Sequence, residues 1–282
     1  MKPVCFLIIF FLAVTVEGQE LYVFTEPASN MPARSMSVRV RGELMGPQPW
    51  HNRAMQRLMP ELMFGVSKKW MVHAGASFGN MHTNNFGWES VSTYLKYRFL
   101  SKDEIHQHFR MAAFAEGAYS RSPFHQDEVN LGGDKTGVQA GIIATQLWNR
   151  FALSGTIGHM QLLDKSRNSK NVIYVPSRIY QAMSYSLSGG YLLLPKEYTD
   201  YKQTNLNVYL EFLAQQSLDR EAYYIDMAPA MQIIFNSNTK LNVGYRFQLN
   251  GTMQRMAKNS WMISLERTFL NALNKKEKNN EN

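Results

Sequence analysis

Apolar and polar residues alternate with a period of two along most of the chain, most clearly between residues 223 and 249. Two alternating arms flank a short polar turn at residues 236–239, a pattern that predicts an antiparallel hairpin. Each arm has about ten residues, close to the length that a tilted β-strand needs to cross a bilayer. We therefore expect this hairpin to be the repeating unit of the fold.

The same alternation recurs over residues 35–270 and predicts about twelve strands. Tight links near residues 68, 101, 149, 195 and 236 alternate with longer links that start near residues 45, 80, 121 and 164. An even strand number with short turns on one side is typical of outer-membrane barrels, in which the short turns and both termini lie in the periplasm. The expected strands cover residues 35–44, 58–67, 70–79, 90–99, 109–120, 137–147, 151–161, 181–193, 204–216, 223–235, 241–249 and 260–270.

A soluble β-sandwich is the alternative fold, because alternation alone shows only that one face of each strand is apolar. The length of the strands, aromatic residues at both ends of the apolar face and charges in the middle of the opposite face favour a membrane. Since an unpaired backbone group in hydrocarbon costs several kcal/mol, a sheet inside a bilayer must have no free edge. The sequence therefore predicts an all-β fold, a closed antiparallel transmembrane β-barrel.

Aromatic residues make up 12% of the chain and are expected to contact outer-membrane lipids at the two interfaces. At the short-turn rim we expect Phe64, Trp70, Phe99, Phe109, Trp148, Phe151, Tyr191, Phe235 and Phe269. At the opposite rim we expect Tyr119, Tyr223, Phe247 and Trp261.

The N-terminus has the pattern of a secretory signal peptide, with Lys2, an apolar run over residues 4–14 and an expected cleavage after Gly18. The apolar run is too short to span a bilayer as a helix. Cys5 is the only cysteine and lies in this signal, so the mature protein can form neither a disulfide nor a thiolate metal site. Residues 19–34 are expected as a periplasmic lead-in or a plug in the lumen, and residues 271–282 as a polar periplasmic tail.

The formal net charge is +8, but the basic residues are spread along the chain except for a small group in the tail. An exported protein meets no genome, so we expect no nucleic-acid partner and assign the charge to the lumen, the rims and the tail.

Charged side chains occupy the inward rows of several strands, six basic and six acidic. The balance favours ion pairs that partly fill the lumen. Because closure makes the first and last strands neighbours, we expect Arg39 and Arg41 to lie near Glu61 and Glu266. This cluster is either a structural network or a constriction that selects solutes. The candidate lumen site comprises Arg39, Arg41, Glu61, Arg246, Glu266, Glu116, Glu211 and Asp226.

Histidine and methionine occur close together at three places, and imidazole and thioether groups suit copper. These places are Met71 with His73, Met81 with His82, and His159 with Met160. None has tight ligand spacing, and methionine elsewhere follows the lipid-facing rows as apolar filling. We therefore expect no metal site and no cofactor.

A phospholipase in this setting would need a histidine beside a serine on the outward face. His159 lies on an apolar row, but the nearest outward hydroxyl is that of Thr136, and the serines of residues 184–188 point inward. We therefore expect no enzymatic activity.

The signal peptide, the dozen amphipathic strands and the aromatic Phe269 at the end of the last strand resemble the outer-membrane β-barrel proteins of Gram-negative bacteria, especially transporter-like barrels of similar size. This resemblance implies an outer-membrane location and a role for Phe269 in recognition by the barrel-assembly machinery. Such barrels usually end at that aromatic, whereas this chain continues to residue 282.

Two functions follow from this reading of the sequence. The first is a channel or transporter-like barrel for the passage of a small solute. The second is a non-conducting structural or surface-interaction barrel whose lumen is filled by its own charges and by residues 19–34. Channel activity distinguishes the two functions.

Overall fold

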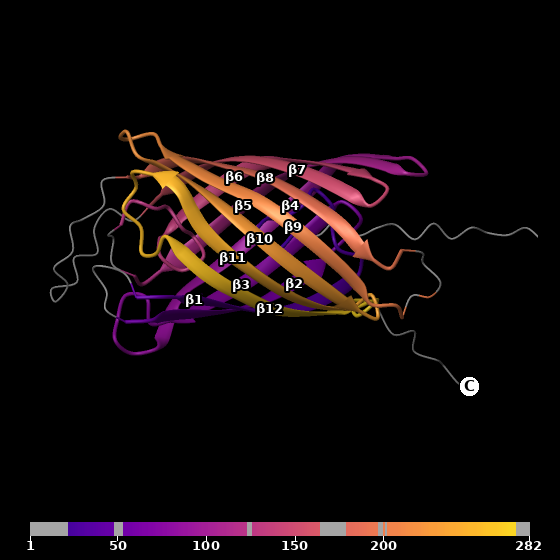
Figure 1. The fold of residues 1–282 in the computed structure, drawn as a ribbon, viewed down its shortest axis with the longest axis horizontal. Coiled ribbons are helices and arrows are strands. Elements are labelled where there is room, and N and C mark those ends of the chain that lie inside the picture. Colours follow the sequence, from indigo (N-terminus) through magenta and orange to yellow (C-terminus); the bar gives the residue numbers. More distant parts are fainter. Residues whose placement is uncertain are drawn as a thin grey trace, which may run out of the picture.

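Twelve strands form one closed antiparallel barrel in the computed structural model, which describes residues 22–47, 53–122, 126–163, 179–196, 200 and 202–274 (Figure 1). Each strand pairs with its neighbours in sequence, and β1 pairs with β12. The predicted fold is confirmed. The strands are β1 (Ser35–Met45), β2 (Met55–Gly65), β3 (Trp70–Gly79), β4 (Gly87–Asp103), β5 (Gln107–Ser120), β6 (Gly137–Trp148), β7 (Phe151–Leu162), β8 (Gln181–Leu194), β9 (Asn205–Ser217), β10 (Tyr223–Phe235), β11 (Thr239–Gly251) and β12 (Asn259–Phe269).

The largest differences from the predicted strand ends lie in β2 and β4. β2 begins at Met55, three residues before the expected start, and β4 runs from Gly87 to Asp103 rather than over residues 90–99. A register shift between Arg98 and Leu100 breaks the alternation in β4, but its pairing with β5 continues as far as Asp103. Because alternation shifts by one residue at such a bulge, a prediction based on a period of two ends the strand too early.

The seam between β1 and β12 closes the sheet. Their register runs from Met36 opposite Phe269 to Leu44 opposite Trp261. No strand edge is left in the barrel, which excludes the sandwich alternative, since a sandwich has two open sheets. Among the described residues, no helix is long and apolar enough to cross a membrane.

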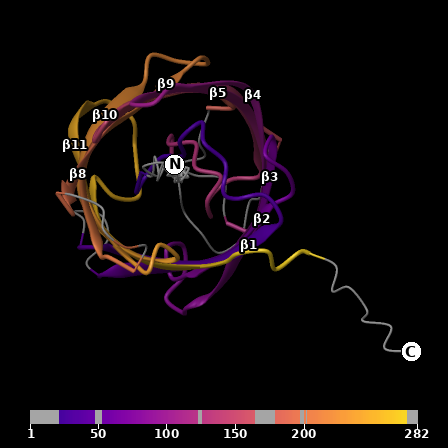
Figure 2. The same cartoon turned by 90° about the vertical axis from the view of Figure 1, so that its right-hand side faces the viewer.

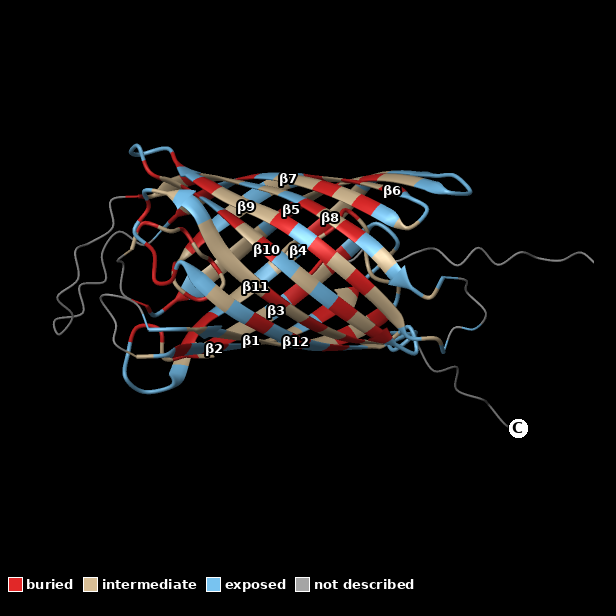
Figure 3. Cartoon of the chain, in the orientation of Figure 1, coloured by how far each residue is buried: buried red, intermediate tan, exposed pale blue. Residues whose placement is uncertain are grey.

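The outer wall of the barrel carries large exposed apolar side chains along the middle of the strands. Exposed and buried positions alternate along the strands (Figure 3). Leu62, Ile142 and Leu265 are examples, with 42%, 46% and 56% of their surface exposed. Aromatic pairs lie near both rims, among them Trp70 with Tyr97 at the short-turn end and Tyr245 with Trp261 at the other. Water is a poor solvent for such a continuous surface, whereas the hydrocarbon of a bilayer matches it.

Both ends of the strand series lie at the short-turn end of the barrel, where the amide of Leu273 donates a hydrogen bond to the carbonyl of Arg34 at 3.0 Å. The periplasmic orientation of this end stays a prediction. The expected signal peptide at residues 1–18 and the tail beyond residue 274 lie outside the described residues.

Among the described residues, three segments without regular structure enter the barrel. Residues 22–34, here called the lumen segment, precede β1 and lie inside the ring of strands (Figure 2). Two connections at the long-loop end fold inward and are called the mouth loops, residues 126–135 between β5 and β6 and residues 252–258 between β11 and β12. Residues 22–34 lie in the lumen, and residues 19–21 of the expected lead-in lie outside the described residues.

Candidate functional site in the barrel lumen

Glu211 on β9 anchors the start of the lumen segment. Its carboxylate accepts hydrogen bonds from the amides of Val23 and Phe24, both at 2.9 Å, and from the Thr25 hydroxyl at 2.7 Å. The Ser188 hydroxyl donates a further bond at 3.2 Å. Among the described residues no basic side chain pairs with this fully buried carboxylate, and the four donors supply the hydrogen bonds that its burial requires. Glu211 therefore binds the backbone of the lumen segment and is not part of the predicted charge cluster.

The opposite wall binds the middle of the lumen segment. The Lys96 ammonium on β4 donates to the carbonyls of Pro27 and Ser29 at 2.7 and 2.9 Å. The amide of Ala28 donates to the Thr145 hydroxyl on β6 at 2.9 Å. Because the segment has no secondary structure of its own, these wall side chains satisfy its backbone groups.

Glu26 is the one acidic residue of the lumen segment, and it lies 3.4 Å from both Arg39 and Lys96. Burial alone would raise the pKa of Glu26, but the positive charges of Lys96 and Arg39 outweigh burial and lower the pKa to about 2. The Glu26 carboxylate is therefore ionised at neutral pH and links the segment to β1 and β4.

Apolar packing completes the attachment of the segment. Tyr22 and Val23 form a buried cluster with wall residues that include Tyr209, and the rings of Tyr22 and Tyr209 meet edge to face at 5.6 Å. Phe24 lies so close to β11 that a Cβ at Gly244 would be 2.5 Å from its ring. Gly244 therefore provides the space that Phe24 occupies.

The predicted cluster at the β1 and β12 seam is present only in part. The Arg39 guanidinium donates to Glu61 at 2.8 Å, and His73 Nδ1 lies 2.8 Å from the other oxygen of Glu61. Glu266 lies opposite Arg39 in the sheet register but binds Lys240, at 2.7 Å. The sequence interpretation missed Lys240, because the strand was expected to begin one residue later. Extending the alternation back by one residue would have placed Lys240 on the inward row.

Arg41 was also expected in this seam cluster, and Glu116 was expected in the wider lumen site. Within the described ranges, neither side chain forms a hydrogen bond or an ion pair, although both line the lumen. Arg41 and Glu116 therefore lie outside the ion-pair networks of the described residues.

Arg246 and Asp226 belong to a different network, at the long-loop end. Arg246 Nε donates to Asp226 at 2.6 Å, and Arg255 from a mouth loop donates to the other oxygen of Asp226 at 2.7 Å. Arg255 also binds Glu128 of the other mouth loop at 2.9 Å and lies over the ring of Tyr224. Burial would raise the pKa of Glu128, but Arg255 and Arg246 lower it overall. This network joins both mouth loops to the wall.

Arg57 on β2 centres a third network and is almost fully buried. Its guanidinium donates to Glu89 on β4 at 2.7 Å and to Asp134 of the mouth loop, which also lies 2.8 Å from His82. Burial would raise the pKa of Asp134, but Arg57 outweighs burial and holds this pKa well below its usual range. Sequence reasoning missed Arg57 and Asp134, because one precedes the expected strand and the other lies in a loop.

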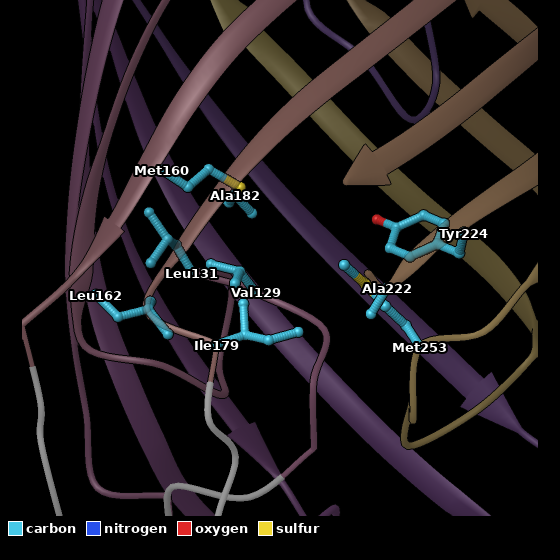
Figure 4. Packing of buried hydrophobic residues seen from close by; sticks show 9 residues of the cluster. All are labelled: Val129, Leu131, Met160, Leu162, Ile179, Ala182, Ala222, Tyr224 and Met253. Atoms are coloured by element: carbon cyan, nitrogen blue, oxygen red, sulfur yellow. The ribbon is translucent and has the colours of Figure 1, made fainter. Parts of the chain in front are cut away.

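A small apolar core underlies the first mouth loop (Figure 4). Val129 and Leu131 pack against wall residues that include Met160 and Leu162. The amide and carbonyl of Val129 both bind the side chain of Gln215, at 2.8 and 2.9 Å. Figure 4 shows the loop lying against the inner wall with these apolar side chains between them.

Three cavities follow one another through the lumen beside the lumen segment. The first has a volume of about 550 Å³ and lies at the short-turn end, the second about 200 Å³, and the third about 340 Å³ beneath the mouth loops. Thr25, Glu26 and Arg39 line both the first and the second cavity. Arg41 and Glu116 line both the second and the third. These shared residues place the second cavity next to both the first and the third.

The remaining expectations concern metal ions and Phe269. Among the described residues, no group of three or more histidine, cysteine or acidic side chains is placed to hold a metal ion. His159 is exposed on the outer wall. Phe269 ends β12 with 44% of its surface exposed, and its role in assembly stays a prediction.

Comparison with known proteins identifies the fold. The sequence matches no family model and no curated protein. An outer membrane channel from Pseudomonas putida F1 has a similar structure, with a TM-score of 0.56 and 13% identity over 88% of this chain and 100% of the channel. The KdgM porin gives a TM-score of 0.44 at 12% identity, over 83% of this chain and 99% of the porin. At such identities the similarity shows the fold alone.

The fold and the outer wall lead to the same location. A closed antiparallel barrel with a lipid-compatible exterior and rim aromatics is the architecture of outer-membrane proteins. The chain is therefore a closed outer-membrane β-barrel.

Proposed function

We propose that this barrel is a narrow channel for the passage of a small polar solute, restricted by the lumen segment. The observation that supports the channel most directly is the series of three cavities with shared walls beside that segment. Charged and hydroxyl side chains line these cavities. A polar solute can therefore exchange its hydrogen bonds to water for hydrogen bonds to the wall. A lumen filled only for stability could be packed with apolar side chains. In the described part of this barrel, apolar packing in the lumen forms only small clusters.

The competing function is a non-conducting barrel for structure or surface interaction. The observation that favours it is the closure of the long-loop end, where both mouth loops are joined to the wall by buried ion pairs. In that case the lumen segment and the mouth loops would together form a permanent filling.

Single-channel recording in planar bilayers tests the proposal. The wild-type protein is expected to give small, steady current steps. A variant that lacks residues 22–33 is expected to give a larger conductance, because the restricting segment is gone. Replacing both Arg39 and Arg41 with alanine is expected to change the conductance and ion selectivity, since both side chains line the second cavity.

Heat-modifiable migration on gels provides the folding control for each variant. If folded wild-type protein and the folded deletion variant both fail to carry current, the channel is excluded and the non-conducting barrel is supported. If removal of residues 22–33 leaves the wild-type conductance unchanged, the lumen segment is not the restriction.

A further inference from the structure

The second cavity contains buried polar atoms that have no partner among the described residues. These atoms are Nε2 of His73 and the hydroxyl oxygen of Tyr94. Both residues line the cavity, and His73 is only 3% exposed. Burying a hydrogen-bonding group without a partner costs free energy, so native structures rarely leave two such groups side by side.

These atoms belong to an ordered row on the inner wall. His73 on β3 lies opposite Tyr94 on β4, and Tyr94 lies opposite Glu116 on β5. Glu61 fixes the His73 ring through Nδ1, which leaves Nε2 for the cavity. The Tyr94 ring is held between His73 and Phe114, with centroids at 5.0 and 5.6 Å. The directions of the unpartnered atoms are therefore set by packing.

A positive charge reaches the same cavity from another part of the wall. Arg41 projects from β1, which is separated from β5 by four inter-strand steps of about 4.8 Å each. In the described part of the chain, Arg41 and Glu116 pair neither with each other nor with another charged group, and both line the cavity of about 200 Å³. Opposite charges face this space from separate strands, and the space lies between them.

We infer that the second cavity is a binding site for a small zwitterion of the α-amino acid class, an inference that rests on the proposed function. A carboxylate matches the fork of the Arg41 guanidinium, and an ammonium group matches the Glu116 carboxylate. A solute with only one of these charges leaves Arg41 or Glu116 without an ion-pair contact. The Tyr94 hydroxyl and His73 Nε2 add hydrogen bonds to the solute. The cavity volume restricts the class to members with small side chains.

Titration calorimetry of the purified full-length barrel in detergent tests this site with L-serine as the probe. We expect saturable binding of L-serine, and binding at least tenfold weaker for lactate, which lacks the ammonium group, and for ethanolamine, which lacks the carboxylate. Arg41→Gln is expected to weaken serine binding at least tenfold. Tyr94→Phe, which preserves the ring packing, is expected to weaken it about fivefold, the effect of one hydrogen bond.

Glu43→Gln is the matched control, because Glu43 lies on the same inward row as Arg41 but lines only the third cavity. It is expected to retain wild-type serine binding. Absence of serine binding, equal binding of the three probes, or wild-type binding by both Arg41→Gln and Tyr94→Phe would overturn the inference.

Current recorded from the same preparations separates this inference from the channel proposal. If current is recorded but serine does not bind, the amino-acid site is contradicted and the channel proposal is retained. If serine binds but no current is recorded, the site is supported and the channel proposal is contradicted.

Discussion

The two ends of the lumen are filled by chain segments that are held by different kinds of contact. At the short-turn end, the lumen segment is held mainly by hydrogen bonds between its backbone and wall side chains such as Glu211, Lys96 and Thr145. At the long-loop end, the mouth loops are held by buried ion pairs around Arg57 and Arg255. A segment of irregular chain and a pair of loops thus fill the same barrel by different physical means.

This difference bears on which end can open. Removing one member of a buried ion pair leaves the other charge uncompensated, at a cost of about 3–5 kcal/mol. A single hydrogen bond to a charged group such as Glu211 or Lys96 contributes about 1.5–3 kcal/mol, on average less than the cost of breaking a buried ion pair. We therefore expect the mouth loops to be the more rigid closure and the lumen segment to be the one that moves when a solute passes.

The largest effect is expected from Arg255→Ala. This change leaves the fully buried Asp226 with Arg246 alone and removes the nearest partner of Glu128. The free energy of unfolding should fall by about 3 kcal/mol or more, measured by urea titration in lipid vesicles. Arg220→Ala is the control, since Arg220 is half exposed and lies 3.7 Å from Asp127. Exposed pairs contribute about 0–1 kcal/mol, so equal losses from the two variants would contradict the assigned rigidity of the mouth.

A smaller and local effect is expected from Glu211→Ala. This change removes the acceptor of the Val23 and Phe24 amides without touching the mouth loops. Hydrogen exchange of these two amides should accelerate tenfold or more, while the Val129 amide, bound to Gln215, keeps its protection. Unchanged exchange at residues 23 and 24 would show that the segment is held by its apolar contacts instead.

Acidification should loosen the lumen segment through Glu26. Because the folded pKa of about 2 lies below the ordinary value of 4.5, the stabilisation is fully present above about pH 4.5 and is lost as the pH falls toward 2. Exchange of the segment amides should therefore rise between pH 5 and pH 2, after correction for the intrinsic rate. Glu26→Gln should remove this pH dependence. If the variant and the wild type show the same pH dependence of amide exchange, other carboxylates are responsible for it.

The sequence predicted the barrel well because each strand carries its own signal. Inward and outward rows follow from a period of two, so the proximity of Arg39 and Glu61 could be derived from neighbouring strands. Closure of the barrel also predicted that Glu266 lies near Arg39, and the two residues are opposite each other in the structure. The sequence pattern could not show that Lys240 binds the Glu266 carboxylate instead.

The contents of the lumen could not be derived in the same way. Glu26, Asp134 and Arg255 lie in segments without periodicity, and their positions depend on the path of the chain inside a closed barrel. Glu211 was expected to pair with charge, whereas backbone amides of the lumen segment take its oxygens. Such partners are set by tertiary packing and leave no local pattern.

The most direct test of the central claim is whether ions pass Arg41 on the path beside the lumen segment. Because Cys5 is the only cysteine and lies in the expected signal peptide, Arg41→Cys gives the mature barrel a single thiol. Single-channel current through this variant is measured before and after addition of a charged, thiol-specific methanethiosulfonate reagent. We expect a clear stepwise change in current on modification, reversed by reductant. Current that is unaffected by a thiol shown to be fully modified, or the absence of current from the folded protein, would contradict it.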